Sequence, residues 1–231
     1  MNNMISPTDE QLQDQLREVK KRLRLSMNGV VSQSMRDKGL NYRIIFGVEL
    51  PRIKYVASFF HPEHKLAQAL WKEDIRECKI MATLLQPQES FYPEIAEIWV
   101  EDIKYLEIAE NLVMHLLQYM DYAPQLAFQW LAREEEFFQV CAYLLITRLL
   151  SKKGDMEDQV AGEFLDQAIS AAFDERYNVR HVAIGAIKRF MQHSEDHAFR
   201  VCRLIEQYKE MDTDYSHQLI RQVEWEAAAY E

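Results

Sequence analysis

A repeated apolar pattern is the feature of this 231-residue chain that most constrains its fold. Four segments place apolar residues at helical spacing around a small central residue, at successive offsets of 32, 32 and 41 residues. A second segment of helical periodicity follows each of them, so the repeating unit is a helical hairpin. The four segments are IRECKIMATLL (75–85), EIAENLVMHLL (107–117), QVCAYLLITRL (139–149) and RHVAIGAIKRF (180–190).

Hairpins of about 30 to 40 residues predict the HEAT-like class of repeat, in which one hairpin cannot bury its apolar face and neighbours stack into a continuous core. We therefore expect an all-α fold, an α–α superhelix (solenoid) of HEAT-like hairpins with a concave inner surface. Periodicity alone leaves open an unrelated helical bundle. We expect one domain over residues 1–231, with a helical N-terminal cap over 1–40 and repeats over about 45–230.

The composition also favours helices. Six glycines and six prolines are few for this length, and good helix formers are plentiful. Pro51, Pro93 and Pro124 fit the first turns of helices, where a missing N–H costs nothing. The periodic stretches predict helices over 8–25, 27–38, 50–60, 62–71, 74–85, 91–102, 105–120, 123–132, 135–151, 156–173, 177–192, 195–209 and 213–229.

Several features concern the compartment and possible cofactors. No apolar run is long enough to span a membrane and the N-terminus has no apolar signal core, so we expect a cytoplasmic monomer. Cys78, Cys141 and Cys202 are odd in number and far apart, which predicts buried thiols rather than disulfides or a zinc site. The histidines lack ligand spacing and no phosphate or dinucleotide loop occurs, so we expect no metal and no cofactor.

The charges are unevenly distributed. A formal net charge of −10 argues against broad attraction to nucleic acid, so any DNA contact must be local. Residues 89–110 carry seven acids against one lysine. The cations form three clusters: Arg17, Lys20, Lys21, Arg22 and Arg24; Arg148, Lys152 and Lys153; and Arg176, Arg180, Lys188 and Arg189.

The run FGVELPRIKYVA (46–57), followed by LAQALWKEDIRECKIMATLL (66–85), resembles the opening of the HEAT-like-repeat DNA alkylation repair family, the AlkD-type alkylpurine DNA glycosylases. A later segment, NVRHVAIGAIKRF (178–190), is similar to a late helix of that family, so the likeness extends from about residue 40 to 192. The matched positions of the first block are Gly47, Pro51, Lys54, Ala57, Leu70, Trp71, Arg76, Glu77, Lys79 and Ala82.

The resemblance implies a concave cleft that holds duplex DNA, and excision of N3- or N7-alkylated purines by a monofunctional glycosylase that needs no metal. The acidic motif of the family places Glu110 on its final aspartate and Glu107 on the preceding acid, with Tyr105 and Leu106 on its two tryptophans. The chain departs from the family elsewhere as well. Gln139, Val140 and Cys141 stand where the family has an arginine, and Ala186 stands where it has a tryptophan.

Two hypotheses of function follow from the resemblance and its departures. In the first, Glu110 acts as the electrostatic acid beside Glu107 and Tyr105, while phosphates are held by Lys152, Lys153, Arg176, Arg180 and Lys188. In the second, the chain is a catalytically inactive module that binds DNA structures or a protein partner on its concave face. The helical position of Glu110, next to the apolar stripe of its helix, fits both a functional acid and a boundary carboxylate.

Overall fold

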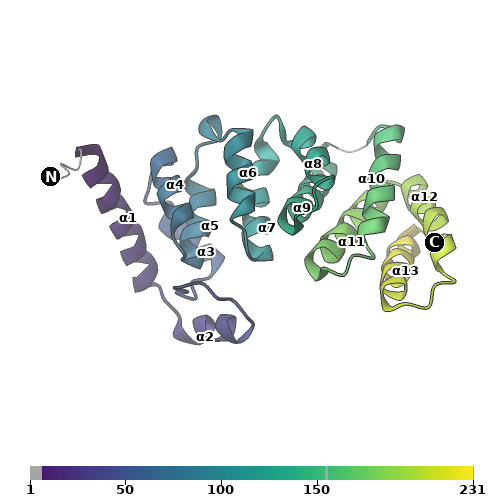
Figure 1. Cartoon of the computed structure of the whole chain (residues 1–231), viewed down its shortest axis with the longest axis horizontal. Helices are drawn as coiled ribbons and strands as arrows, with labels where there is room; N and C mark the ends of the chain where they lie inside the picture. Colours follow the sequence, from purple (N-terminus) through teal and green to yellow (C-terminus); the bar gives the residue numbers. More distant parts are fainter. Residues whose placement is uncertain (1–6, 154–155, 231) are drawn as a thin grey trace. The chain divides into compact units, whose positions relative to one another are not determined.

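The computed structural model describes residues 7–153 and 156–230, and the side chains of residues 7, 8 and 153 lie outside that description. Thirteen α-helices and four short 3-10 helices make up this part of the chain, and no strand occurs in it (Figure 1). Within the same residues, no helix is both long enough and apolar enough to cross a lipid bilayer. The predicted all-α composition is confirmed.

The helices fall into two compact units, divided between Trp99 and Val100 within α6 (Pro93–Glu101). The first unit contains α1 (Pro7–Leu25), α2 (Gly29–Asp37), α3 (Leu50–Ala57), α4 (His64–Lys72) and α5 (Arg76–Leu85). The second contains α7 (Leu106–His115), α8 (Ala123–Leu131), α9 (Glu136–Lys153), α10 (Asp158–Ala171), α11 (Tyr177–Met191), α12 (Glu195–Ile205) and α13 (Asp214–Ala227). One domain over residues 1–231 stays a prediction.

All thirteen predicted helices have counterparts, although several end earlier than the periodicity indicated. The backbone of Leu116 (φ −134°, ψ −68°) ends α7, and a 3-10 turn over Leu117–Tyr119 replaces the last part of the predicted helix 105–120. The helices predicted over 195–209 and 213–229 also finish in 3-10 turns. Apolar spacing alone misplaces these ends because 3-10 turns keep nearly the same side-chain spacing.

The second unit is built from stacked hairpins in two layers. Helix α9 packs against α7, α8 and α11, while α11 packs against α9, α10, α12 and α13. The helices α7, α9, α11 and α13 therefore form one row, and α8, α10 and α12 form the covering layer (Figure 1). The repeat segments 107–117, 139–149 and 180–190 fall on α7, α9 and α11, as the repeat predicted.

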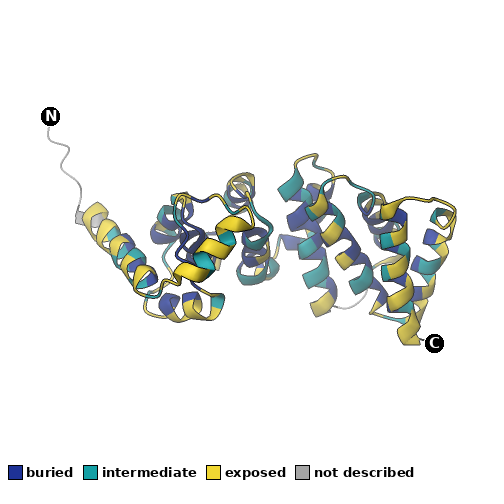
Figure 2. Cartoon of the chain, turned by 90° about the horizontal axis from the view of Figure 1, so that it is seen from below, coloured by how far each residue is buried: buried dark blue, intermediate teal, exposed yellow. Residues whose placement is uncertain are grey.

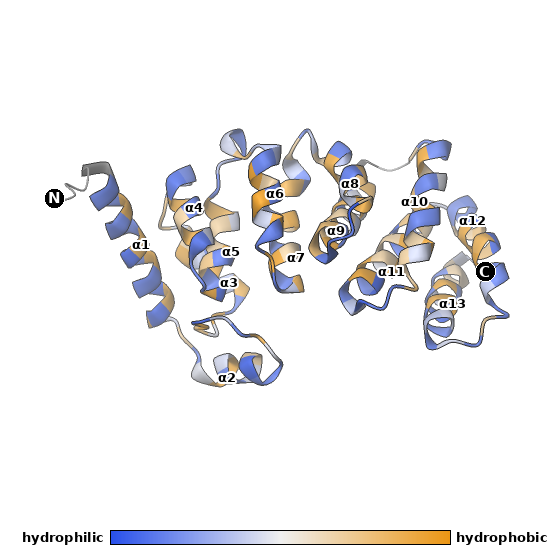
Figure 3. Cartoon of the chain, in the orientation of Figure 1, coloured by the Kyte–Doolittle hydropathy of each residue, from blue (hydrophilic) through white to orange (hydrophobic). Residues whose placement is uncertain are grey.

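Helix α9 shows how the stacked helices of the second unit enclose one another. Val140, Cys141, Leu145 and Ile146 are all fully buried, because three neighbouring helices cover different sides of α9. Figure 2 shows buried residues running through the helices of this unit, and Figure 3 shows hydrophobic and hydrophilic residues alternating along them. Burial of the apolar sides leaves the polar sides of the row free for contact with other molecules.

In the first unit, a buried carboxylate fixes the loop before α3 onto the start of α5. Glu77 is completely buried and accepts hydrogen bonds from the backbone N–H groups of Phe46 (3.0 Å), Gly47 (2.9 Å) and Val48 (3.2 Å). Arg76 donates to both the Glu77 carboxylate and the Val48 carbonyl, each at 2.9 Å. This network satisfies polar groups that would otherwise be unpaired in the core.

Gly47 lies where this loop passes closest to α2. Its φ of +70° is in the left-handed region, and a Cβ there would lie 2.3 Å from the Asn28 carbonyl oxygen and 2.5 Å from the Ser32 nitrogen. In the same unit, the rings of Trp71 and Trp99 stack in parallel with their centroids 4.1 Å apart, and the Lys79 Nζ lies 4.7 Å from the centroid of the Trp71 ring. Positions that carry the family resemblance thus hold the first unit together.

Replacing Glu77 by Gln removes the negative charge that faces Arg76 and three N–H donors. We expect the free energy of unfolding to fall by about 3–5 kcal/mol, because a buried cation and several donors lose their charged partner. Glu73→Gln is the matched control, since Glu73 pairs with Lys20 (2.9 Å) in a partly exposed position worth under about 1 kcal/mol. Urea unfolding measures both variants, and equal losses would contradict a special role for Glu77.

Candidate nucleic-acid interface

Helix α7 begins directly after Tyr105, whose extended backbone (φ −140°, ψ 140°) ends the preceding loop. Glu107 therefore lies in the first turn of the helix, and Glu110 follows one turn later. The Glu107 side chain is half-buried, as is that of Tyr105, whereas Glu110 is exposed. Glu110 thus lies at the surface of the row rather than inside the core.

A hollow of about 300 Å³ opens beside Glu110 within the second unit. Its wall comes from four helices of one row, so residues far apart in the sequence share it. Among the described residues no phenylalanine, tyrosine or tryptophan lines this hollow. The lining is Glu110 from α7; Leu144 and Thr147 from α9; His181, Val182, Ile184, Gly185 and Lys188 from α11; and Gln218 and Gln222 from α13.

The Glu110 carboxyl group has an unusual environment. Within the described part of the chain it makes no hydrogen bond or ion pair. Partial burial raises its pKa above the ordinary value of a glutamate, and the nearby Glu107 carboxylate raises it further. His181 and Arg148 act in the opposite direction. Both predicted interpretations of Glu110, a functional acid and a boundary carboxylate, therefore stay predictions.

Two predicted residues, Glu110 and Lys188, are brought together by the hollow. The Lys188 Nζ donates to the Gln222 side chain (3.0 Å), lies 3.7 Å from the Glu226 carboxylate and sits 5.0 Å above the Trp225 ring. Lys188 thereby connects α11 to α13 while its side chain remains only half-buried. Glu226 partly balances its charge. Lys188 therefore stabilises the contact between α11 and α13 and also contributes positive charge to the lining of the hollow.

Arg176 is held in the protein by several contacts. Its guanidinium forms a two-point pair with Asp174, at 2.6 Å and 2.9 Å, and donates to the Gln139 side chain at 2.9 Å and the Glu134 carbonyl at 2.7 Å. The contact with Arg176 holds the pKa of the Asp174 carboxyl below its usual range. Gln139 is thus a partner of Arg176.

Of the remaining predicted cations, Arg180 and Lys152 lie near the ends of two middle helices of the row. Arg180 donates to the Asp174 carbonyl (2.6 Å) and lies 4.4 Å from the Tyr215 ring, near the start of α11. Lys152 is exposed near the end of α9, where it donates to the Gln118 carbonyl (3.1 Å) and sits 4.0 Å above the Tyr119 ring. The side chain of Lys153 lies outside the described residues.

The sequence pattern did not single out His181, Gln218 and Gln222 as site residues, and it noted Arg148 only as part of a basic cluster. A signal for the α11 residues was available, because His181, Gly185 and Lys188 are four and three residues apart and so share one face of the helix. No comparable signal points to Gln218 and Gln222, whose helix lies outside the four repeat segments. In the described residues, no cluster of three or more His, Cys, Asp or Glu could hold a metal ion.

Charge is unevenly distributed among the helices of the second unit. Helix α10 carries Asp158, Glu163 and Asp166 and no lysine or arginine. Helices α9 and α11 of the row carry a single acid, Glu136. Their six cations are Arg148, Lys152, Lys153, Arg180, Lys188 and Arg189. The two middle helices of the row are therefore basic, whereas the flanking helices α7 and α13 together carry five acids against the single cation Arg221.

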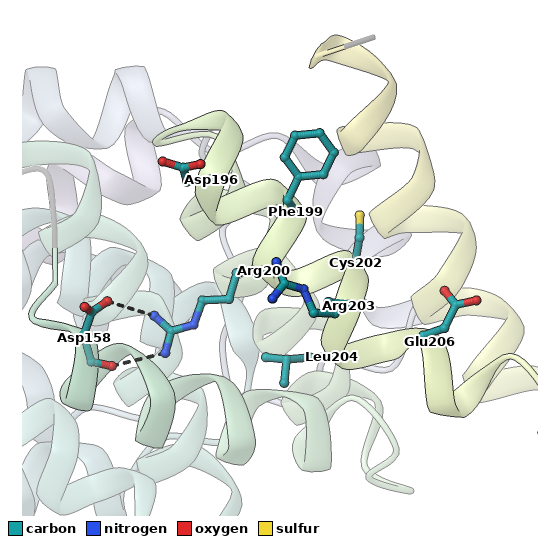
Figure 4. Close-up of a pocket in the computed structure, with 8 residues that line it drawn as sticks. All are labelled: Asp158, Asp196, Phe199, Arg200, Cys202, Arg203, Leu204 and Glu206. Atoms are coloured by element: carbon teal, nitrogen blue, oxygen red, sulfur yellow. Dashed lines mark hydrogen bonds and ion pairs between the residues drawn. The ribbon is translucent and has the colours of Figure 1, made fainter.

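A larger hollow of about 910 Å³ lies along α10 and α12 and contains no predicted site residue (Figure 4). Arg200 reaches across it to Asp158, with contacts of 3.3 Å to the carboxylate and 3.1 Å to the carbonyl.

Cys202 lines this hollow and is half-buried, which corrects the prediction of a fully buried thiol. Cys78 and Cys141 are buried as predicted. Burial raises the pKa of the Cys202 thiol, so it stays protonated at neutral pH.

The pKa shift of Glu110 predicts how its replacement changes stability. A raised pKa means that the folded state pays an electrostatic cost for the ionised carboxylate, so stability falls as pH rises through the raised pKa. Glu110→Gln removes that cost, and we expect the variant to be at least as stable as the wild type at about pH 7.5. The difference should shrink as the pH falls and should disappear well below about pH 4.3, the ordinary pKa of a glutamate, where the folded and the unfolded wild type both hold the proton.

Urea unfolding at the two pH values measures this effect. Glu101→Gln, at an exposed glutamate of the same unit, controls for the loss of one negative charge. A clear loss of stability in Glu110→Gln at neutral pH would instead identify Glu110 as a carboxylate held by a stabilising partner.

The chain was compared with protein families, with curated proteins and with solved structures. The model of the DNA alkylation repair enzyme family matches residues 19–187. No protein with a curated description matches the chain in sequence. A solved structure matches with a TM-score of 0.76 at 11% identity, covering 91% of this chain and 94% of that one. It is described as a new family of proteins related to the HEAT-like repeat DNA glycosylases, with affinity for branched DNA structures. The predicted fold of HEAT-like hairpin repeats is confirmed by this likeness.

Proposed function

Because the chain belongs to the DNA alkylation repair enzyme family, we propose that it binds DNA through the exposed side of α7, α9, α11 and α13. The observation that carries the proposal is the concentration of positive charge on the two middle helices of this row, where α9 and α11 carry six cations against one acid. Binding of nucleic acid depends chiefly on neutralising phosphates. A basic layer in a protein of net charge −10 provides a local surface for that purpose.

Arg148 and Lys152 are the cations best placed to contact phosphates. Arg148 is half-buried, and in the described residues its side chain makes no hydrogen bond or ion pair. Lys152 is exposed, and its one hydrogen bond is to a carbonyl group, which leaves its charge unbalanced. Arg176 forms an ion pair with Asp174, so its role is to hold the start of α11 in place rather than to contact phosphates. A surface of this kind grips the DNA backbone without reading the sequence of bases.

The class of DNA follows from the fold and from the neighbouring structure. The protein of matching fold has affinity for branched DNA structures, and stacked helical hairpins present long surfaces to extended ligands. We take duplex DNA, including branched forms, as the ligand of this row. A protein partner on the same surface is the alternative, and it would be recognised by binding that persists when every DNA probe fails.

Neutralising two of these cations tests the binding surface. We expect the double variant Arg148→Gln/Lys152→Gln to bind duplex DNA at least about tenfold more weakly near 0.1 M salt, with a salt slope shallower by about two. Arg203→Gln/Lys209→Gln, which removes the same charge from α12 and the loop after it, is the matched control. Fluorescence anisotropy across a salt series measures both, and equal affinities would remove the row as the binding surface.

Base excision is the second candidate function, and the position of Glu110 favours it. In this reaction the bond between C1′ and the purine nitrogen breaks, and its electron pair leaves with the base. Water then attacks C1′ and releases a proton. An ionised Glu110 would stabilise the positive charge that develops on the sugar, provided the hollow receives the nucleotide. Among the described residues that line the hollow, His181 alone has a ring for stacking, so DNA binding stands first and excision second.

A base-release assay on methylated duplex DNA tests excision. If Glu110 supports the reaction, we expect free alkylated base from the wild type and a loss of roughly 100-fold or more in Glu110→Gln. Equal release from both proteins would exclude a catalytic role for Glu110. Tight DNA binding without any release would leave the chain as a binding module.

A further inference from the structure

A basic hollow lies in the first unit, against the helix next to the N-terminus. It has a volume of about 590 Å³ and opens between α1 and the segment that precedes α3. One wall is entirely cationic and the opposite wall is apolar. The cationic wall is Arg17, Lys20, Lys21 and Arg24, and the apolar wall is Ile44, Phe46 and Ile75.

The four cations form one stripe along α1, here called the α1 stripe. Their spacing of three, four and seven residues from Arg17 places them on a single face of the helix. Leu16, Val19 and Leu23 are buried on another side of α1, and this packing fixes the stripe toward the hollow. Figure 2 shows α1 with much of its length exposed.

The contacts within the α1 stripe are weak enough for a ligand to replace them. Arg17 pairs with Asp14 (3.0 Å) and Lys21 with Glu18 (3.7 Å), and both pairs lie on the exposed surface of α1. Pairs of this kind contribute about 0–1 kcal/mol. The side chain of Arg24 makes no hydrogen bond or ion pair with the described residues. Only Lys20 is held more firmly, by Glu73 at 2.9 Å.

We infer that the α1 stripe is a second binding surface for the sugar-phosphate backbone of DNA. Seven residues of helix span about 10 Å, which matches roughly three phosphates along the axis of one DNA strand. The apolar wall of Ile44, Phe46 and Ile75 suits contact with deoxyribose. No exposed aromatic ring lines the hollow among the described residues, so the surface fits a backbone better than unstacked bases.

This inference rests on the proposed function and extends it. One basic surface is carried by the row of the second unit and another by α1 of the first unit. A chain with two such surfaces can hold two segments of DNA, such as two arms of a branched molecule. It can equally hold two stretches of one duplex.

The double variant Lys21→Gln/Arg24→Gln of the full chain tests the α1 stripe. Both side chains are exposed, so the variant should fold as the wild type does, which circular dichroism and thermal melting check. Lys54→Gln/Lys65→Gln is the matched control, since these exposed lysines lie on α3 and α4 outside the hollow and remove the same charge. Fluorescence anisotropy with a linear duplex and a four-way junction, each across a salt series, measures binding.

We expect Lys21→Gln/Arg24→Gln to weaken binding by at least about tenfold near 0.1 M salt and to reduce the salt slope by about two, while the control changes little. A loss on both DNA probes, or on the junction alone, supports the inference. Affinities equal to the control on both probes overturn it. If Arg148→Gln/Lys152→Gln still binds weakly in that case, the proposed function stands without the second surface. Failure of the wild type to bind either probe removes both.

Discussion

The constraint on which this structure depends is that a single helical hairpin cannot bury its apolar face. Helix α9 illustrates the result, because α7, α8 and α11 must all pack against it before its side chains leave water. Burial of apolar area is the main favourable contribution to folding, so the stacking of hairpins fixes the rotation of each helix. The side of the row that remains exposed is then available for charged residues and for ligands.

In the first unit, packing also requires that buried backbone polar groups find hydrogen-bond partners. A long loop precedes α3, and its backbone N–H groups would be costly to bury without partners. The Glu77 carboxylate accepts three of them, and Arg76 balances its charge. Gly47 allows the loop to pass close to Asn28 and Ser32, where a side chain would collide. The most recognisable motif of the sequence therefore serves folding, and it carries no information on catalysis.

The residues around Glu110 differ from those that the family resemblance implies. Helices α9 and α11 supply a basic layer, and Glu110 lies without a fixed partner beside a hollow of moderate size. Both features suit a protein that contacts DNA. Among the described residues no phenylalanine, tyrosine or tryptophan lines this hollow, Tyr105 included, and Ala186 is buried in the core. Binding and excision therefore rest on different residues of the same row and can be tested separately.

The sequence by itself determined the helices, the repeating hairpin and the family, because helical periodicity and repeat spacing are local properties of the chain. It also located Glu110 and the clusters of cations. Only the tertiary structure decided which charges are available, because partners come from distant segments. Arg176 is occupied by Asp174, Gln139 and Glu134, whereas Arg148 is left without a partner among the described residues. Packing between elements also set the end of α7 at Leu116, the neighbours of Glu110 and the apolar wall opposite the α1 stripe. No pattern along the chain encodes these features.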